Sequence, residues 1–65
     1  MYDLVKIGEA CRHYRKFKLK IPQKEAADIM GYSATHISNF ERGKVNNILI
    51  LLWYVSQGFD VKKVI

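Results

Sequence analysis

Residues Gln23–Gly43 read QKEAADIMGYSATHISNFERG, and the architecture follows from this segment. Pro22 directly precedes it and can open a helix, because its fixed φ suits the first helical turn. Gly31 can end this helix, since glycine tolerates the positive φ of the position after a C-cap. Ser33 is a good N-cap for a second helix, because its hydroxyl can accept an orphan backbone N–H. The segment therefore predicts two short helices that meet at a tight turn.

The apolar residues of this segment indicate how the two helices pack. Ala27 is small, so a second helix can cross close to it. Ile37 and Phe40 lie at helical spacing and predict the buried side of the second helix. Gly43 can stop that helix. Two helices that meet at a glycine-centred turn are typical of a helix-turn-helix motif.

Upstream of the motif, a helix is predicted from about Leu4 to Phe17. Its apolar residues recur at three- and four-residue steps and form one stripe: Ile7, Ala10, Cys11, Tyr14 and Phe17. We interpret Cys11 as a small core residue, because it lies within this stripe.

Downstream of the motif, Asn46 or Asn47 can cap a fourth helix that lasts until Gly58, and Asp60 can cap a final short turn. A buried strand over residues 48–55 is the alternative, but the asparagine cap and the terminal glycine favour a helix. The predicted fold is all-α, a compact bundle of five short helices around a central helix-turn-helix. We expect one domain over residues 1–65, with a dimerisation segment at about 48–65.

The positions of the motif share one register with a known family: Gln23, Ala27, Gly31, Ser33, Ile37, Ser38, Glu41, Arg42, Gly43 and Lys44. On these residues the chain resembles the lambda-repressor/Cro superfamily of XRE-type helix-turn-helix proteins, over roughly residues 5–58. The resemblance implies a DNA-binding domain whose third helix enters the major groove. It also implies a structural ion pair between Arg15 and Glu41.

The outward positions of the third helix are the expected base-reading residues: Ala34, Thr35, Ser38 and Asn39. Asn39 has the geometry to bond adenine bidentately through N6 and N7. Ala34 and the methyl group of Thr35 can contact a thymine methyl. These neutral side chains would supply specificity.

Phosphate contacts are expected from the polar and basic residues around the motif: Lys18, Lys20, Gln23, Lys24, Tyr32, His36, Arg42 and Lys44. The resemblance assigns Gln23, at the start of the second helix, to backbone phosphate. A solvated flank is the alternative interpretation of His36.

The charge of the chain is concentrated before the motif. Eleven basic and six acidic residues give a net charge of +5, which indicates a polyanionic partner. Residues 1–24 hold seven basic and two acidic residues, whereas residues 25–42 hold one and three. Affinity is therefore expected from the basic flank rather than from the reading helix.

Residues 48–55 form an uninterrupted apolar run, ILILLWYV, which covers every side of a helix. A chain of 65 residues cannot easily bury both faces of such a helix. We therefore expect one face to meet a second copy, with these contact residues: Leu49, Leu52, Trp53, Phe59, Val61, Val64 and Ile65. The alternative to a dimer interface is a solvent-exposed surface that carries several aliphatic side chains.

The leading functional hypothesis is a sequence-specific transcriptional regulator, a homodimeric repressor that binds a palindromic operator in double-stranded DNA. Related hypotheses are an antitoxin with a protein partner and a restriction-modification controller. A different class is a protein-interaction module that keeps the fold, such as an anti-defence inhibitor of a phage or mobile element.

Several other classes are not expected. The sequence offers no Ser-His-Asp set and no paired carboxylates for catalysis, so an enzyme is not expected. One cysteine, without zinc-finger spacing to the two histidines, predicts no disulfide, metal or cofactor. The apolar run is far shorter than a membrane span, and acidic and basic residues interrupt the amino terminus. A cytoplasmic protein is the expectation.

Overall fold

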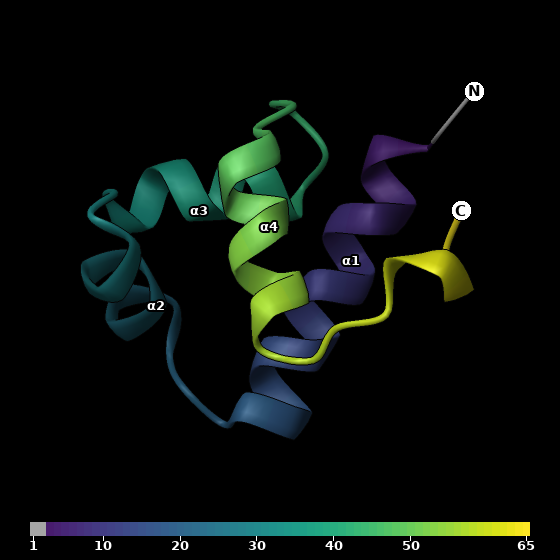
Figure 1. The fold of residues 1–65 in the computed structure, drawn as a ribbon. Helices are drawn as coiled ribbons and strands as arrows, with labels where there is room; N and C mark the ends of the chain where they lie inside the picture. Colours follow the sequence, from purple (N-terminus) through teal and green to yellow (C-terminus); the bar gives the residue numbers. More distant parts are fainter. Residues whose placement is uncertain (1–2) are drawn as a thin grey trace.

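Four α-helices begin and end where glycine, proline and cap residues interrupt the chain. A computed structural model describes residues 3–65 (Figure 1). The elements are α1 (Leu4–Tyr14), the π-helical turn η1 (Arg15–Leu19), α2 (Gln23–Met30), α3 (Ala34–Glu41), α4 (Ile48–Ser56) and the 3₁₀ turn η2 (Val61–Lys63). Residues 3–65 contain no strand, so the all-α prediction is confirmed for the described part of the chain.

The prediction of five helices is wrong by one, because the last element is only a single 3₁₀ turn. Asp60 caps it as expected, its side chain accepting from the Lys62 amide at 3.1 Å. The Val61 carbonyl then accepts from the amides of Val64 and Ile65, at 3.0 and 3.3 Å. A segment this short and rich in β-branched residues cannot offset the cost of helix nucleation.

The first α-helix ends at Tyr14, before the predicted end at Phe17, and a π-helical turn continues it to Leu19. After Tyr14 the chain widens into η1, and the Arg15 carbonyl accepts from the Ile21 amide at 3.3 Å. Lys20 ends the turn with a φ of 56°, the only positive φ of a non-glycine residue among residues 3–65. A π turn breaks the 3.6-residue periodicity. Phe17 therefore leaves the predicted stripe and is 61% exposed.

The caps predicted from the sequence are confirmed. Gly31 follows α2 with a φ of 79°, in the left-handed region. The Ser33 hydroxyl accepts from the His36 amide at 3.2 Å at the start of α3. Asn47, rather than Asn46, caps α4, with its Oδ1 accepting from the amides of the second and third helical residues at 3.0 and 3.3 Å.

The core lies where all four α-helices converge, and it contains these buried residues: Ile7, Cys11, Ala27, Ile37, Phe40, Ile50, Tyr54 and Phe59. Cys11 is fully buried, as predicted for a small core residue. Burial raises the pKa of the Cys11 thiol to about 12, and the nearby charge of Glu41 adds to the effect. Gly8 lets α1 approach the end of α3, because a Cβ there would lie 2.5 Å from the Glu41 carbonyl oxygen.

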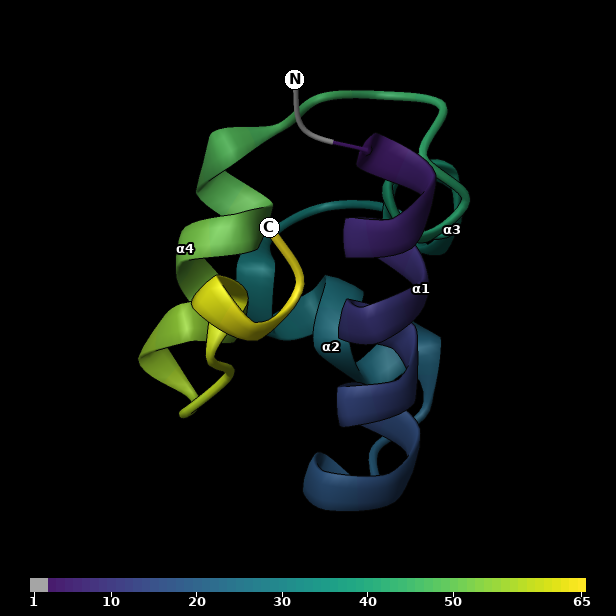
Figure 2. The same ribbon diagram turned by 90° about the vertical axis from the view of Figure 1, so that its right-hand side faces the viewer.

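The C-terminal segment turns back beside α1, as the two ribbon views agree (Figure 1, Figure 2). Gly58 makes this return with a φ of 105°. Phe59, expected at a dimer interface, is instead only 7% exposed and belongs to the core. Its ring meets those of Tyr14 and Tyr54 edge-on, which the sequence pattern could not indicate because both contacts depend on the return. No helix of residues 3–65 is long and apolar enough to cross a membrane.

Candidate nucleic-acid interface

α3 is held on one side and open on the other. Ile37, Phe40 and Glu41 are buried against the body of the chain. The four predicted base-reading residues lie on the remaining face: Ala34, Thr35, Ser38 and Asn39. Thr35 is exposed, and the other three are half-buried. Figure 1 shows α3 at the edge of the bundle.

A buried ion pair fixes the C-terminal end of α3. Arg15 donates from Nε to Oε2 of Glu41 at 2.9 Å and from Nη2 to Oε1 at 3.2 Å. Both side chains are nearly inaccessible to solvent. A bidentate arginine–carboxylate pair has a fixed geometry. The pair therefore locks the end of α3 onto the end of α1.

Further donors complete the surroundings of the Glu41 carboxylate. Gln23 donates from Nε2 to Oε1 at 3.0 Å, and the Tyr54 hydroxyl donates to Oε2. The third guanidinium nitrogen of Arg15, Nη1, donates a hydrogen bond to the Ile21 carbonyl oxygen at 2.9 Å. Burial alone raises the pKa of Glu41, but the hydrogen bonds from Arg15, Tyr54 and Gln23 outweigh burial and hold that pKa below its ordinary range. The carboxylate stays ionised and connects η1, α2 and α4 to the end of α3.

Beside this network lies a polar hollow of about 420 Å³ at the junction of α1, α2 and α3. Arg12 and Arg42 line it and are both exposed, and Gln23 and Ser38 lie between them. The lining also includes the carboxylates of Glu9 and Glu41, so the two guanidinium groups are the groups of this hollow that can bind an anion. Arg12 was missing from the phosphate-binding residues expected from sequence. The sequence feature that could have identified Arg12 is its position three residues before Arg15, nearly one helical turn away.

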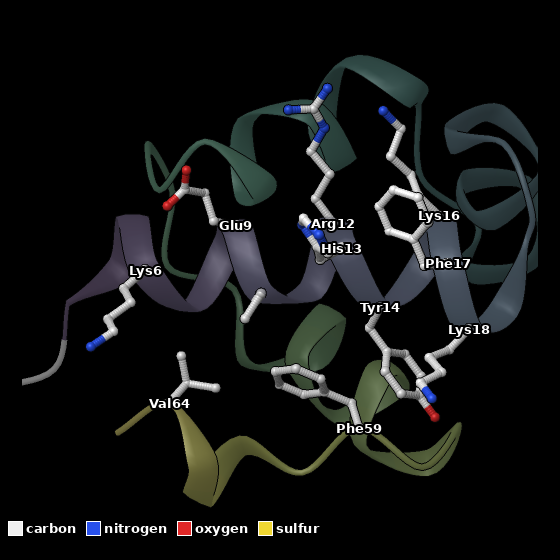
Figure 3. A pocket seen from close by; sticks show the side chains of 11 residues that line it. Lys6, Glu9, Arg12, His13, Tyr14, Lys16, Phe17, Lys18, Phe59 and Val64 are labelled. Atoms are coloured by element: carbon white, nitrogen blue, oxygen red, sulfur yellow. The ribbon is translucent and has the colours of Figure 1, made fainter.

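The predicted phosphate-binding lysines do not all lie together. Lys20, Lys24 and Lys44 are exposed in the connections and first turn around the motif. Lys18 instead lines a second groove with Tyr14 and Phe59. In Figure 3 its side chain extends toward the C-terminal segment, whereas the side chain of Arg12 extends to the other side of α1.

Tyr32 and His36 lie at the N-terminal end of α3, where both contact the residue that caps α4. Their rings stack with centroids 4.7 Å apart and an angle of 7°. Asn47 donates from Nδ2 to His36 Nε2 at 3.1 Å and lies 3.4 Å from the Tyr32 hydroxyl. Asn47 also caps α4, so one amide side chain connects the start of the third helix with the start of the fourth.

α4 divides into a buried and an exposed face. Ile50 and Tyr54 are buried in the core. The exposed face carries four large apolar side chains: Ile48, Leu49, Leu52 and Val55. Of the remaining predicted dimer residues, Trp53, Val61 and Val64 are half-buried against the core, and Ile65 is exposed.

Three comparisons with known proteins complete the description. A family model described as Helix-turn-helix matches residues 12–48, which is more than half of the chain. The protein is therefore a helix-turn-helix protein of the DNA-binding regulator class. More narrowly, the chain belongs to the XRE-type, lambda-repressor-like family, as its motif predicted. Members of this family are typically DNA-binding regulators rather than enzymes. Searches of the curated proteins and of the solved structures found no match.

Proposed function

We propose that this chain is a sequence-specific transcriptional repressor that binds a palindromic operator as a homodimer. One observation carries the proposal. The open face of α3 presents neutral polar side chains directly beside two exposed arginines, Arg12 and Arg42. Neutral polar groups read base edges, and guanidinium groups hold phosphates.

Base discrimination falls to the open face of α3. Asn39 reads adenine through a bidentate pair of hydrogen bonds, and Thr35 and Ser38 contact neighbouring bases. The polar network beneath Glu41 supports this role. It holds the helix in one orientation before DNA binds, so little ordering entropy is lost on binding.

Affinity comes from the cations that surround the motif. Arg12, Arg42 and Gln23 contact phosphates at the hollow, and Lys20, Lys24 and Lys44 contact the flanking backbone. Each phosphate neutralised releases counterions, which makes the affinity fall steeply with salt. Such contacts position the protein without reading sequence.

A second copy completes the regulator. The exposed face of α4 supplies the apolar contact, with Leu49 and Leu52 at its centre. Two copies related by a two-fold axis place their α3 helices in successive major grooves, about 34 Å apart. A dimer on a promoter excludes RNA polymerase, and repression follows from that exclusion.

Selection of bound duplexes from a random double-stranded pool tests the proposal. We expect a palindromic consensus with half-sites one helical turn apart. A variant carrying Asn39→Ala, selected in parallel, should lose the preference at one base pair of each half-site. Enrichment of no sequence over the starting pool would contradict the assignment.

A second candidate is an antitoxin or anti-defence inhibitor that uses the same fold to bind a protein. One observation favours it: α3 carries no charged side chain from Ala34 to Phe40. The same selection separates the two functions. A protein-binding module would return no consensus, whereas a repressor returns one.

A further inference from the structure

A second groove lies between the first helix and the C-terminal segment, and its lining includes no residue of α2 or α3. It is an open groove of about 880 Å³ with an apolar floor made of Ala10, Tyr14, Phe59 and Val64. Figure 3 shows α1 along one wall and the C-terminal segment along the other. The residues expected to read bases play no part in this groove.

A hydrogen bond, an aromatic contact and a glycine turn hold the floor in place. The Tyr14 hydroxyl donates to the Gln57 carbonyl at 2.8 Å, and its ring packs edge-on against Phe59 with centroids 5.6 Å apart. A Cβ at Gly58 would lie 2.7 Å from the Tyr14 hydroxyl oxygen, so the return of the chain needs a glycine here. The groove is thus part of the fold and needs no partner to form.

Phe17 also lines this open surface, beside Lys16 in Figure 3, and is 61% exposed. Its ring packs on His13 with centroids 4.8 Å apart and makes no contribution to the core. An exposed aromatic side chain beside an apolar concavity is the usual form of an anchor at a protein interface. The core does not account for Phe17, whereas an interface would.

The rim of the groove is strongly cationic. Four basic side chains and one acidic side chain line it, Lys6, Arg12, Lys16 and Lys18 against Glu9, which leaves a net charge of +3. In Figure 3 the arginine and Lys16 extend from one side of α1, while Lys6 and Lys18 extend from the other. Lys6 and Lys18 are thus the cations on the side of α1 that faces the floor, and Arg12 and Lys16 add positive charge on the opposite side of the helix.

We propose that this groove binds an acidic segment of a partner protein, which inserts an aromatic or aliphatic side chain beside Phe17. Charge complementarity supplies the long-range attraction, and burial of the apolar side chain supplies the contact energy. A second copy of this chain is disfavoured, because it would bring like charges together. Duplex DNA is disfavoured because a convex rod cannot reach a concave apolar floor, so the groove adds a function beside DNA binding.

A display library of random peptides, selected on the full-length chain, tests the inference. We expect the selected peptides to combine several Asp or Glu residues with one central aromatic or aliphatic residue. For the best peptide, Phe17→Ala should weaken binding about tenfold or more. Lys6→Glu should weaken it several-fold, and this loss should shrink as salt rises.

Matched controls keep the result specific. Ile29→Ala removes a comparably exposed apolar side chain from α2, outside the groove, and should leave peptide binding unchanged. Phe17→Ala should keep the helical circular dichroism spectrum and the affinity for duplex DNA. Arg12 lines both this groove and the hollow beside α3, but Phe17 and Lys6 are not among the residues proposed to contact DNA, so these two substitutions test peptide binding separately.

Four results would overturn the inference. Selected peptides without an excess of acidic residues would do so, as would peptides whose binding survives Phe17→Ala. The third is a wild-type chain that self-associates in sedimentation while Phe17→Ala is monomeric, since the occupant would then be a second copy. Competition of single-stranded DNA for the groove, with no peptide selected, would assign it to nucleic acid instead.

Discussion

Gln23 donates a hydrogen bond from Nε2 to Glu41 Oε1 at 3.0 Å and so joins the first residue of α2 to the last residue of α3. The same carboxylate binds Arg15 and Tyr54. The orientation of the helix proposed to read DNA is therefore set by polar groups from three other parts of the chain. Four predictions follow from this network and from the two faces beside it.

Removing the Glu41 carboxylate should destabilise the chain severely. Glu41→Ala leaves the Arg15 guanidinium buried without its partner, which costs about 3–5 kcal/mol. For a domain of this size, that is close to the whole free energy of unfolding. Thermal denaturation followed by circular dichroism measures the loss. The double variant Arg15→Met/Glu41→Leu removes both charges and should lose less than Glu41→Ala alone. A single-variant loss below about 1 kcal/mol would contradict a buried, energetically important pair.

Acid should destabilise the fold through the same residue. The pKa of Glu41 is lower in the folded chain than its ordinary value. At acid pH the unfolded chain therefore binds more protons at this site, so the stabilisation is present above the ordinary carboxyl pKa. It is lost as the pH falls from there through the lower pKa of the folded chain. Urea denaturation midpoints across this range measure the effect. Glu41→Gln has no titrating group at this position and should show a shallower decline; an equal slope in both proteins would exclude Glu41 as the cause.

Two substitutions should separate base reading from phosphate binding. Asn39→Ala should weaken binding to the selected operator by about 1–3 kcal/mol and relax the preference at one base pair. Arg12→Ala should weaken binding to operator and random duplex alike, and it should lower the slope of log affinity against log salt by about one. Fluorescence anisotropy titrations at several salt concentrations give both quantities. If each substitution lowered specific and random binding equally, the proposed division of roles would be wrong.

The apolar face of α4 should control the oligomeric state. Leu52 is 53% exposed, so Leu52→Glu should place a charge on this face without disturbing the core. We expect the wild type to sediment as a dimer at micromolar concentration and the variant as a monomer with an unchanged helical spectrum. Ile29→Glu adds the same charge to an exposed apolar position on α2 and should remain dimeric. A monomeric wild type would remove the dimer from the proposed function.

The elements of the fold were predictable because their signals are local. Gly31, Ser33 and Asn47 each act within one helical turn, and each does what its side chain predicts. The π turn was not predictable from the apolar stripe, because its register depends on how the chain reaches Lys20 and Ile21. Phe17 was consequently assigned to the core and lies outside it.

Only the part of the candidate site that lies on a single helix was predictable from the sequence. The outward face of α3 follows from helical spacing alone. The positions of Phe59, Arg12 and Lys18 depend instead on which helix sides meet after folding. Charge pattern placed Lys18 with the phosphate-binding group because it lies within a basic run. That run winds around a helix, so its members point to different surfaces.

The amide of Asn47 links the two helices that the proposed function depends on. Its oxygen holds the first turn of α4, and its nitrogen holds the imidazole of His36. A displacement of the N-terminal end of α4 would therefore also break the contact between Asn47 and His36 at the N-terminal end of α3. In the proposed dimer, one asparagine would therefore connect the helix that meets the second copy to the helix that reads DNA.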